Sequence, residues 1–286
     1  MNTLIPVIID GLFLGISLAV LAAGLAIVVN VIKIINLSHG AFFLLGCYLA
    51  YTASHQIHHA ALIFPVAFFG PALIGLFISK AIVSPLRKDS FAVSVSTLAV
   101  AILFEQIAQI LWGDRALSVH PGNPLTHIGG TGIYRWHVNE LIFIVLIALL
   151  FFLLSRTKLG LSMKITAEDE EMAKSVGVDT EMTRGIAFAL ACGLSSLAGL
   201  LTAPAVTISP TSGRMPLIVS LIVVILSGHE RLLPVLLTGT GVGIISNLLA
   251  HLLPSYASYT GLLLVTVLLL LAKPSGLFGF DLERDY

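Results

Sequence analysis

The stretch Leu4-Ile-Pro-Val-Ile-Ile-Asp-Gly-Leu-Phe-Leu-Gly-Ile-Ser-Leu-Ala-Val-Leu-Ala-Ala-Gly-Leu-Ala-Ile-Val-Val29 decides the fold class, because Asp10 is its single charged residue. A helix needs about 20 predominantly apolar residues to cross the hydrocarbon core of a bilayer, and this run is long enough. The run is continuously apolar, whereas a strand of a membrane barrel alternates between apolar and polar residues. The sequence therefore predicts a transmembrane helix over Leu4–Val29.

Similar apolar runs recur along the rest of the chain. They are Ile34–Ala53, Ala60–Ser79, Phe91–Trp112, Leu141–Ser155 with some flank, Gly185–Ile208, Leu232–Leu253 and Tyr256–Ala272, with a shorter run at Pro216–Ser227. The short run cannot cross a bilayer straight, so we interpret it as a half-helix or a re-entrant segment. We predict an all-α polytopic bundle of eight or nine membrane segments, forming a single transmembrane domain over residues 1–286.

The composition supports a membrane protein. Of the 286 residues, 57% are hydrophobic and 10% charged, whereas soluble domains carry about 25% charged residues. Fifteen basic residues balance fifteen acidic ones, so no net charge attracts nucleic acid, and we expect no such partner. The motifs GxxxxGK[ST], HExxH and GxSxG do not occur in the sequence, so we expect no enzyme. If ATP drives this protein, another chain must hydrolyse it.

Cysteine and histidine residues do not predict a metal site. Cys47 and Cys192 both lie inside apolar runs, so neither a disulfide scaffold nor a thiolate site is expected. His55, His58 and His59 have a spacing that could place ligands on one helical face. However, the surrounding sequence offers no carboxylate or cysteine to complete a coordination shell. We interpret the histidine cluster as a polar loop.

The distribution of Lys and Arg predicts the orientation in the membrane, because cytoplasmic loops are enriched in these residues. The segments Lys80–Lys88 and Arg156–Arg184 hold three and five lysine and arginine residues, and we expect both in the cytoplasm. The segment Gly113–His137 has two arginines and several Gly, Pro and His residues, and we expect it outside. The Lys273–Tyr286 tail is then cytoplasmic if the short run Pro216–Ser227 crosses the membrane.

Small residues spaced four apart predict tight helix packing, because they allow two backbones to approach closely in lipid. The pairs are Gly11 with Gly15, Gly239 with Gly243, and Ser195 with Gly199. We interpret them as ordinary bundle packing rather than as a dimer surface.

A polar interruption, Asn36-Leu-Ser-His-Gly40, separates the first two apolar runs. Irregular backbone at membrane depth is tolerated where protein buries it or where it lines a wet cavity, and broken helices recur at transport pathways. Asn36, Ser38, His39 and Gly40 are therefore candidates for a translocation path. A plain cytoplasmic turn explains the segment equally well, and both readings stay open.

Glu105 is the single carboxylate deep in the run Phe91–Trp112. An ionisable residue within a membrane helix is a functional candidate, so we include Glu105 in the candidate path. The alternative is that Glu105 is partly hydrated, because Trp112 resembles an interfacial anchor about two turns away.

The segment Thr166-Ala-Glu-Asp-Glu-Glu-Met-Ala-Lys-Ser-Val-Gly177 predicts a short cytoplasmic helix with both ends marked. Thr166 is a candidate N-cap, with Asp169 three residues later as in a capping box. Glu168 and its acidic neighbours suit the positive end of the helix dipole. Lys174 lies near the other end, where Gly177 can adopt a left-handed terminating conformation.

The same helix is predicted to present a small apolar face formed by Met172, Ala173 and Val176. A capped helix with an apolar face, held between two membrane spans in the loop 156–184, suits docking into a groove of a partner protein. A helix lying on lipid headgroups is the alternative. It is less favoured, because anionic lipid would repel the mainly acidic charges.

Five segments, in this order, carry a family resemblance. They are Gly11-Leu-Phe-Leu-Gly15, Asn36-Leu-Ser-His-Gly40 followed by Gly46-Cys-Tyr48, Pro85-Leu-Arg87, the stretch from Met163-Lys164 through Ala167-Glu-Asp169 to Ala173 and Gly177, and Pro274-Ser-Gly-Leu-Phe-Gly279. From about Asp10 to Gly279 the chain resembles the membrane subunits of ABC importers for branched-chain amino acids and related small solutes, such as urea and short amides. It departs from that family where Lys164 replaces an arginine, and where Ser227-Gly-His-Glu-Arg231 replaces a glycine-rich loop.

The resemblance implies a permease subunit in a bacterial-type inner membrane. Its implied partners are a second permease, identical or different, two cytoplasmic ATPases that use ATP, an extracytoplasmic solute-binding protein and membrane lipid; the chain itself needs no cofactor. The resemblance also implies that the loop helix couples the ATPases to transport, through Lys164, Glu168, Asp169, Met172, Ala173, Val176 and Gly177. The alternatives are an ion- or proton-coupled secondary transporter that works alone and, less favoured, a membrane hydrolase.

Overall fold

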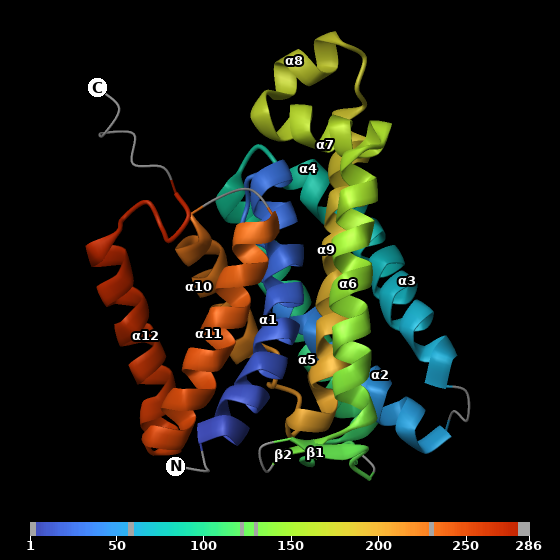
Figure 1. Ribbon diagram of the computed structural model, residues 1–286. Helices are drawn as coiled ribbons and strands as arrows, with labels where there is room; N and C mark the ends of the chain where they lie inside the picture. Colours follow the sequence, from blue (N-terminus) through green and yellow to red (C-terminus); the bar gives the residue numbers. More distant parts are fainter. Residues whose placement is uncertain (1–3, 57–59, 121–122, 129–130, 229–231, 280–286) are drawn as a thin grey trace.

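The structure, a computed structural model, describes residues 4–56, 60–120, 123–128, 131–228 and 232–279 (Figure 1). Its helices are α1 (Leu4–Ile32), α2 (His39–Gln56), α3 (Ala60–Ile78), α4 (Ser84–Leu86), α5 (Ser90–Trp112), α6 (Arg135–Ser155), α7 (Lys158–Glu168), α8 (Glu170–Ser175), α9 (Thr180–Thr202), α10 (Arg214–Ser227), α11 (Leu232–Leu252) and α12 (Ser255–Ala272). A π-helical turn, Ser79–Val83, joins α3 to α4, and a 3₁₀ turn, Ala203–Ala205, follows α9. The strands β1 (Thr126–Ile128) and β2 (Thr131–Ile133) form a small antiparallel hairpin. The predicted helical bundle is confirmed.

Six helices in the described part of the chain are long and apolar enough to cross a membrane: Leu4–Ile32, Leu62–Leu86, Ser90–Trp112, Arg135–Ser155, Thr180–Ala205 and Leu232–Leu252. The apolar helices Arg214–Ser227 and Ala257–Ala272 are shorter. The 14 residues of α10 span about 21 Å at 1.5 Å per residue, against about 30 Å for a bilayer core. The structure therefore does not establish the predicted eight or nine crossings.

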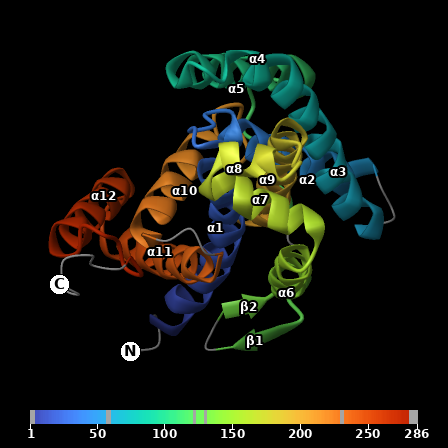
Figure 2. The same cartoon turned by 90° about the horizontal axis from the view of Figure 1, so that it is seen from above.

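Two helices form the centre of the bundle. Each long helix contains an apolar stretch of 18 residues. Of that stretch, 78% is buried in α1 and 89% in α9, against 11% in α6. Figure 2, seen from above, shows the other long helices arranged around α1 and α9. Helices that are apolar on every side belong in a core or against lipid. Exposed residues of α6, such as Val145 and Phe152, are accordingly suited to contact lipid.

The spaced small residues make the close contacts expected of them. Gly11, Gly15, Gly239 and Gly243 lie between α1 and α11, and a Cβ atom added at Gly243 would lie 2.1 Å from the Cα atom of Gly15. The backbones are therefore too close for any larger residue there. On α9, the Ser195 hydroxyl donates a hydrogen bond of 2.6 Å to the carbonyl of His39. The reading of these pairs as packing positions is confirmed.

The bundle has two chemically different ends. One end carries α4, α7 and α8, and the hairpin β1–β2 lies at the other, as Figure 1 shows. An ion pair of 3.2 Å between Arg87 and Glu170 joins the segments Lys80–Lys88 and Arg156–Arg184 at the α8 end. The segment after α12 lies at that end too, where the Leu277 amide donates to the carbonyl of Leu226 at 2.7 Å. This arrangement agrees with the predicted sharing of one membrane side, while the identity of that side stays a prediction.

Candidate functional site

The segment predicted to form one loop helix contains the end of α7 and the whole of α8. α7 extends to Glu168, so Thr166 is buried inside it. Asp169 is the N-cap of α8, because its carboxylate accepts hydrogen bonds from the Glu171 amide at 2.8 Å and the Met172 amide at 3.0 Å. The predicted N-cap at Thr166 is therefore wrong. The residues before Thr166 continue a helix, so the extended backbone that a cap requires first occurs at Asp169.

The predicted end of the loop helix is confirmed. Gly177 has a φ angle of +81°, a left-handed conformation that glycine adopts without steric cost. The Gly177 amide donates to the carbonyl of Lys174 at 3.0 Å, and the Val178 amide donates to the carbonyl of Ala173 at 3.0 Å. These bonds pair carbonyl groups that the helix end would otherwise leave unpaired.

The apolar face of α8 differs from the predicted one. Met172 and Val176 are 60% and 62% exposed, whereas Ala173 is fully buried. Residues four apart share one face of a helix, while adjacent residues point in different directions. Ala173 therefore packs against the chain itself, and the exposed apolar surface consists of Met172 and Val176.

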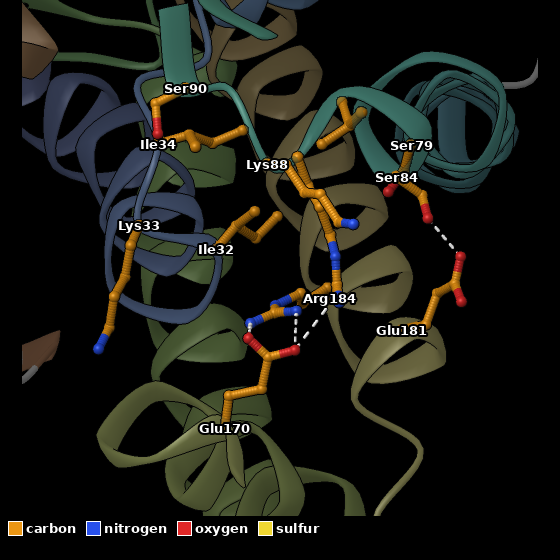
Figure 3. Close-up of a pocket in the computed structure, with 12 residues that line it drawn as sticks. Ile32, Lys33, Ile34, Ser79, Ser84, Lys88, Ser90, Glu170, Glu181 and Arg184 are labelled. Carbon is orange, nitrogen blue, oxygen red and sulfur yellow. Dashed lines mark hydrogen bonds and ion pairs between the residues drawn. The ribbon is translucent and has the colours of Figure 1, made fainter. Parts of the chain in front are cut away.

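Glu170 fixes α8 to the rest of the bundle (Figure 3). Its carboxylate accepts hydrogen bonds from the Arg184 guanidinium at 2.8 and 2.5 Å, and forms ion pairs with Lys174 at 2.8 Å and Arg87 at 3.2 Å. Arg184 belongs to α9 and Arg87 follows α4, so three elements meet at one carboxylate. Hydrogen bonds from Arg184, and then from Lys174, hold the pKa of Glu170 well below its usual range.

The sequence reading missed Glu170. The only available signal was an acidic residue in the first turn of a predicted helix, which is common at helix N-termini. A cavity of about 380 Å³ lies beside the cluster, between the end of α1 and the start of α9, and Lys33, Lys88 and Glu181 contribute to its lining. Within it the Ser84 hydroxyl donates a hydrogen bond to the Glu181 carboxylate.

The polar interruption between α1 and α2 is a buried turn. Asn36, Ser38 and His39 are each 0% exposed. The Asn36 side-chain oxygen accepts hydrogen bonds from the amide and hydroxyl of Ser38, at 3.0 and 2.6 Å. His39 Nε2 donates to the carbonyl of Leu21 at 2.9 Å, and Gly40 lies directly against Gly213. The chain's own helices thus bury this turn, and its role in translocation stays a prediction.

Glu105 is paired rather than isolated. The Arg214 guanidinium donates two hydrogen bonds to its carboxylate, at 2.9 and 2.6 Å. The Glu105 side chain is 12% exposed and that of Arg214 is 63% exposed. The pair joins α5 to the start of α10. The buried turn contacts α5 at a different place, since the Leu37 amide donates to the Thr97 hydroxyl at 3.2 Å, so the described contacts do not join these candidates in one site.

A second buried carboxylate lies outside every predicted site. α6 begins at Arg135, earlier than the apolar run at Leu141, and it thereby includes Glu140, which is 1% exposed. The Ser17 hydroxyl on α1 donates to Glu140 Oε1 at 2.8 Å. Glu140 also lines a cavity of about 620 Å³ at the hairpin end of the bundle. Sequence reading missed it because it precedes the apolar run instead of interrupting it.

The histidine cluster of the α2–α3 connection is only partly described. His58 and His59 lie outside the described residues. His55 is exposed, and its Nδ1 atom lies 2.9 Å from the carbonyl of Tyr51. The segment after α10 that departs from the family pattern includes residues 229–231, which also lie outside the described part of the chain.

Known proteins resemble the chain over nearly its whole length. It is 27% identical over 287 residues to the probable branched-chain amino acid transport permease protein LivH of Methanocaldococcus jannaschii, which covers 93% of this chain and 90% of the relative. It is 22% identical over 290 residues to the high-affinity branched-chain amino acid transport system permease protein BraD of Pseudomonas aeruginosa. That alignment covers 95% of this chain and 94% of the relative. For the high-affinity LivH permease protein of Escherichia coli K12 the identity is 23% over 293 residues, at 94% coverage of both.

No solved structure gives a significant match to the chain. The family model described as the permease component of branched-chain amino acid transport systems matches residues 7–272. The match includes α1 through α12 almost completely. The chain therefore belongs to the family of branched-chain amino acid transport system permease components.

Proposed function

We propose that this chain is the membrane-spanning permease subunit of an ATP-driven ABC importer for branched-chain amino acids or a related small polar solute. Its function is to couple ATP hydrolysis by partner subunits to solute movement across the membrane. The coupling role is supported by α8. This short capped helix presents Met172 and Val176 to solvent and is fixed to α9 through Glu170.

The mechanical connection runs from α8 to the core of the bundle. Arg184 lies in the second turn of α9 and is bound bidentately by Glu170. α9 is the most deeply buried of the long apolar helices. Rigid elements joined by hydrogen-bonded ion pairs move together better than elements joined by a flexible loop. A displacement of α8 by a docked ATPase would therefore move α9, which packs against α1, α2 and α3.

The docking surface combines apolar and charged side chains. Met172 and Val176 provide the apolar centre, and an exposed pair of Lys164 and Glu168, 3.9 Å apart, lies on the adjoining turn of α7. Asp169 and Gly177 contribute by fixing the two ends of α8. An amphipathic helix of this kind fits a hydrophobic groove with a polar rim.

The other partners follow from the same proposal. The solute-binding protein delivers solute outside, at the hairpin end, and a second permease completes the path. Exposed apolar residues on α5, including Ile110 and Leu111, provide surface for lipid or for that second permease. The segment 156–184 and the described residues 273–279 lie in the cytoplasm in this arrangement, because both are at the α8 end.

A secondary transporter that works alone is the alternative. It would need an ionisable residue at a coupling site, and Glu140 is such a residue. The family match favours the importer, and α8 has no role in the alternative.

The test is reconstitution of the chain with its ATPase, second permease and binding protein in proteoliposomes. The parent complex should transport L-leucine only when ATP is present on the side of the membrane where the ATPase is bound. Met172→Asp should weaken ATPase association and reduce leucine-stimulated ATP hydrolysis by about tenfold, since a charge would enter a desolvated contact. Leu125→Asp changes an exposed leucine at the opposite end of the bundle; it is the control for ATPase association, in which it should equal the parent.

Two outcomes would contradict the proposal. Uptake by this chain alone, driven by an ion gradient without ATP, would support the secondary transporter. A Met172→Asp complex that assembles and hydrolyses ATP like the parent would remove α8 as the docking surface.

A further inference from the structure

The hairpin end of the bundle contains a polar cavity that the coupling role does not use. Its volume is about 620 Å³, and it lies between the first half of α1, the start of α6, the end of α11, the start of α12 and the turn after α9. These elements meet at the end of the bundle opposite α8 (Figure 1). The polar and aromatic residues that line it include Asp10, Ser17, Tyr134, Trp136, His137, Glu140, Asn247 and Tyr259.

Glu140 in the cavity wall has an unused hydrogen-bond acceptor. Its Oε1 atom accepts a hydrogen bond from the Ser17 hydroxyl at 2.8 Å. Its Oε2 atom is buried and has no hydrogen-bond partner among the described residues. Leaving a buried carboxylate oxygen unpaired is costly in free energy. A cationic ligand that brings its own donors would pair this oxygen and stabilise the ionised form of the carboxyl group.

The cavity lining does not supply positive charge. Neither lysine nor arginine is among its lining residues. His137 Nδ1 accepts a hydrogen bond of 3.0 Å from the Tyr134 amide, so that nitrogen carries no proton and the imidazole is neutral. The Asn247 amide group donates instead to the carbonyl of Val7, at 2.7 Å. Asp10, which is exposed, adds a second carboxylate, so the cavity as a whole favours a cation.

The rest of the lining favours an organic cation over a metal ion. Trp136, Tyr134 and Tyr259 line the cavity, and aromatic faces attract ammonium groups. Across the described residues, no three His, Cys, Asp or Glu side chains are placed to hold a metal ion. Leu14 and Val206 add apolar surface on which an aliphatic chain can pack.

We propose that this cavity binds the ammonium group of a small aliphatic solute, with Glu140 Oε2 as its acceptor. Asp10 attracts the cation at the exposed part of the wall, the aromatic side chains face the ammonium group, and Leu14 and Val206 contact the alkyl part. The inference deepens the proposed function, on which it rests, by naming the amino group as the part of the solute that this subunit recognises.

Tryptophan fluorescence of the full chain in nanodiscs tests the site directly. The chain has two tryptophans, so Trp112→Phe leaves Trp136, in the cavity wall, as the single reporter. The probes are L-leucine, 3-methylbutan-1-amine, which keeps the ammonium group without the carboxylate, and 4-methylpentanoate, which lacks the ammonium group. Leucine and the amine should change the fluorescence in a saturable way, and 4-methylpentanoate should not.

Variants then assign the acceptor. Glu140→Gln, which preserves shape, should raise the half-saturating concentration of the amine by about tenfold or more. Asp10→Asn should raise the half-saturating concentration by a smaller factor. Because Asp10 is exposed, this variant should fold like the parent. Asn139→Ser is the matched control, because Asn139 is the adjacent residue of α6 but lines a different cavity. It should bind the amine like the Trp112→Phe parent.

The outcomes separate the cavity from the transport role. Unchanged amine binding in both Glu140→Gln and Asp10→Asn would overturn the inference, as would a saturable response to KCl or NaCl in place of the amine. Leucine uptake and ATP hydrolysis by the reconstituted complex form the independent readout for the proposed function. Normal transport with unchanged binding in Glu140→Gln would remove the cavity site and leave the importer intact.

Discussion

Glu170 and Glu140 lie at opposite ends of the bundle and have opposite surroundings. Glu170 is bound by Arg184, Lys174 and Arg87, so its charge is satisfied by the chain itself. Glu140 has one hydroxyl donor, from Ser17, and its second oxygen has no partner in the described structure. A fully paired carboxylate fixes elements together, whereas an unpaired one is available to a ligand. This difference underlies our two proposals, mechanical coupling at the α8 end and solute recognition at the hairpin end.

Reversing the charge of Glu170 should have the largest effect. Glu170→Lys places a fourth cation among three and releases α8 from α9. Solute-stimulated ATP hydrolysis by the reconstituted complex should fall by about 10- to 100-fold, while Trp136 fluorescence should still report amine binding. Glu171→Lys changes the adjacent, exposed acid and serves as control. Loss of amine binding in Glu170→Lys would show that the two ends are not separate.

Replacing both members of the Glu140–Ser17 pair should separate binding from stability. A buried polar pair replaced by apolar groups of similar shape can be nearly neutral for folding. Glu140→Met with Ser17→Ala should therefore melt within a few degrees of the parent but bind 3-methylbutan-1-amine about tenfold more weakly or worse. A melting temperature far below the parent, with no recovery relative to Glu140→Met alone, would indicate a structural role for the carboxylate.

Removing the observed cap of α8 should destabilise the helix moderately. Asp169→Ala should cost about 0.5–2 kcal/mol of local stability and speed hydrogen exchange at the amides of Glu171 and Met172. Thr166→Ala, at the wrongly predicted cap, is the comparison. Faster exchange at these amides in Thr166→Ala than in Asp169→Ala would reinstate the sequence-based cap.

The smallest effect should be the pH dependence of the Glu170 cluster. The folded protein holds the pKa of Glu170 below its ordinary value of 4.5, so the cluster stabilises the fold fully above that pH. The contribution shrinks as the pH falls below 4.5, because the unfolded chain then binds the proton more readily than the folded cluster does, and it is lost as the pH falls through the lowered pKa of the folded state. The melting temperature of the parent should exceed that of Glu170→Gln by a constant amount from pH 7 to pH 5.5, and the difference should narrow as the pH falls from 4.5 to 3. A difference that grows on acidification would contradict this sign.

The sequence predicted the bundle well because its signals are local. Apolar runs such as Leu4–Val29 report membrane helices from their length alone, and the spacing of Gly239 and Gly243 reports close packing. The sequence did not predict which way side chains face on a helix or which charged groups form ion pairs. The sequence could not tell that Ala173 faces inward while Met172 and Val176 face out, because that depends on which side of α8 meets the bundle.

The sequence named candidate site residues but could not give the side chains that contact them. The reading of Glu105 as an isolated path residue could not anticipate Arg214, which is distant in sequence and reaches it only through the packing of α10 beside α5. For the same reason a docking test at Ala173, which the sequence places on the apolar face, would disturb a buried position. The exposed Met172 is the sound place for that test.

By itself, the sequence determined that this protein is a helical membrane bundle with a loop helix that ends at Gly177. These properties follow from composition, local periodicity and a glycine that tolerates a positive φ angle. The importer-like character came from the resemblance of five segments to a known family. Only the tertiary structure decided that Glu170 joins α8 to α9 and that Glu140 lines a cavity with one oxygen unpaired. The physical reason is that a carboxylate's role depends on its donors, and here those donors come from helices far apart in the chain.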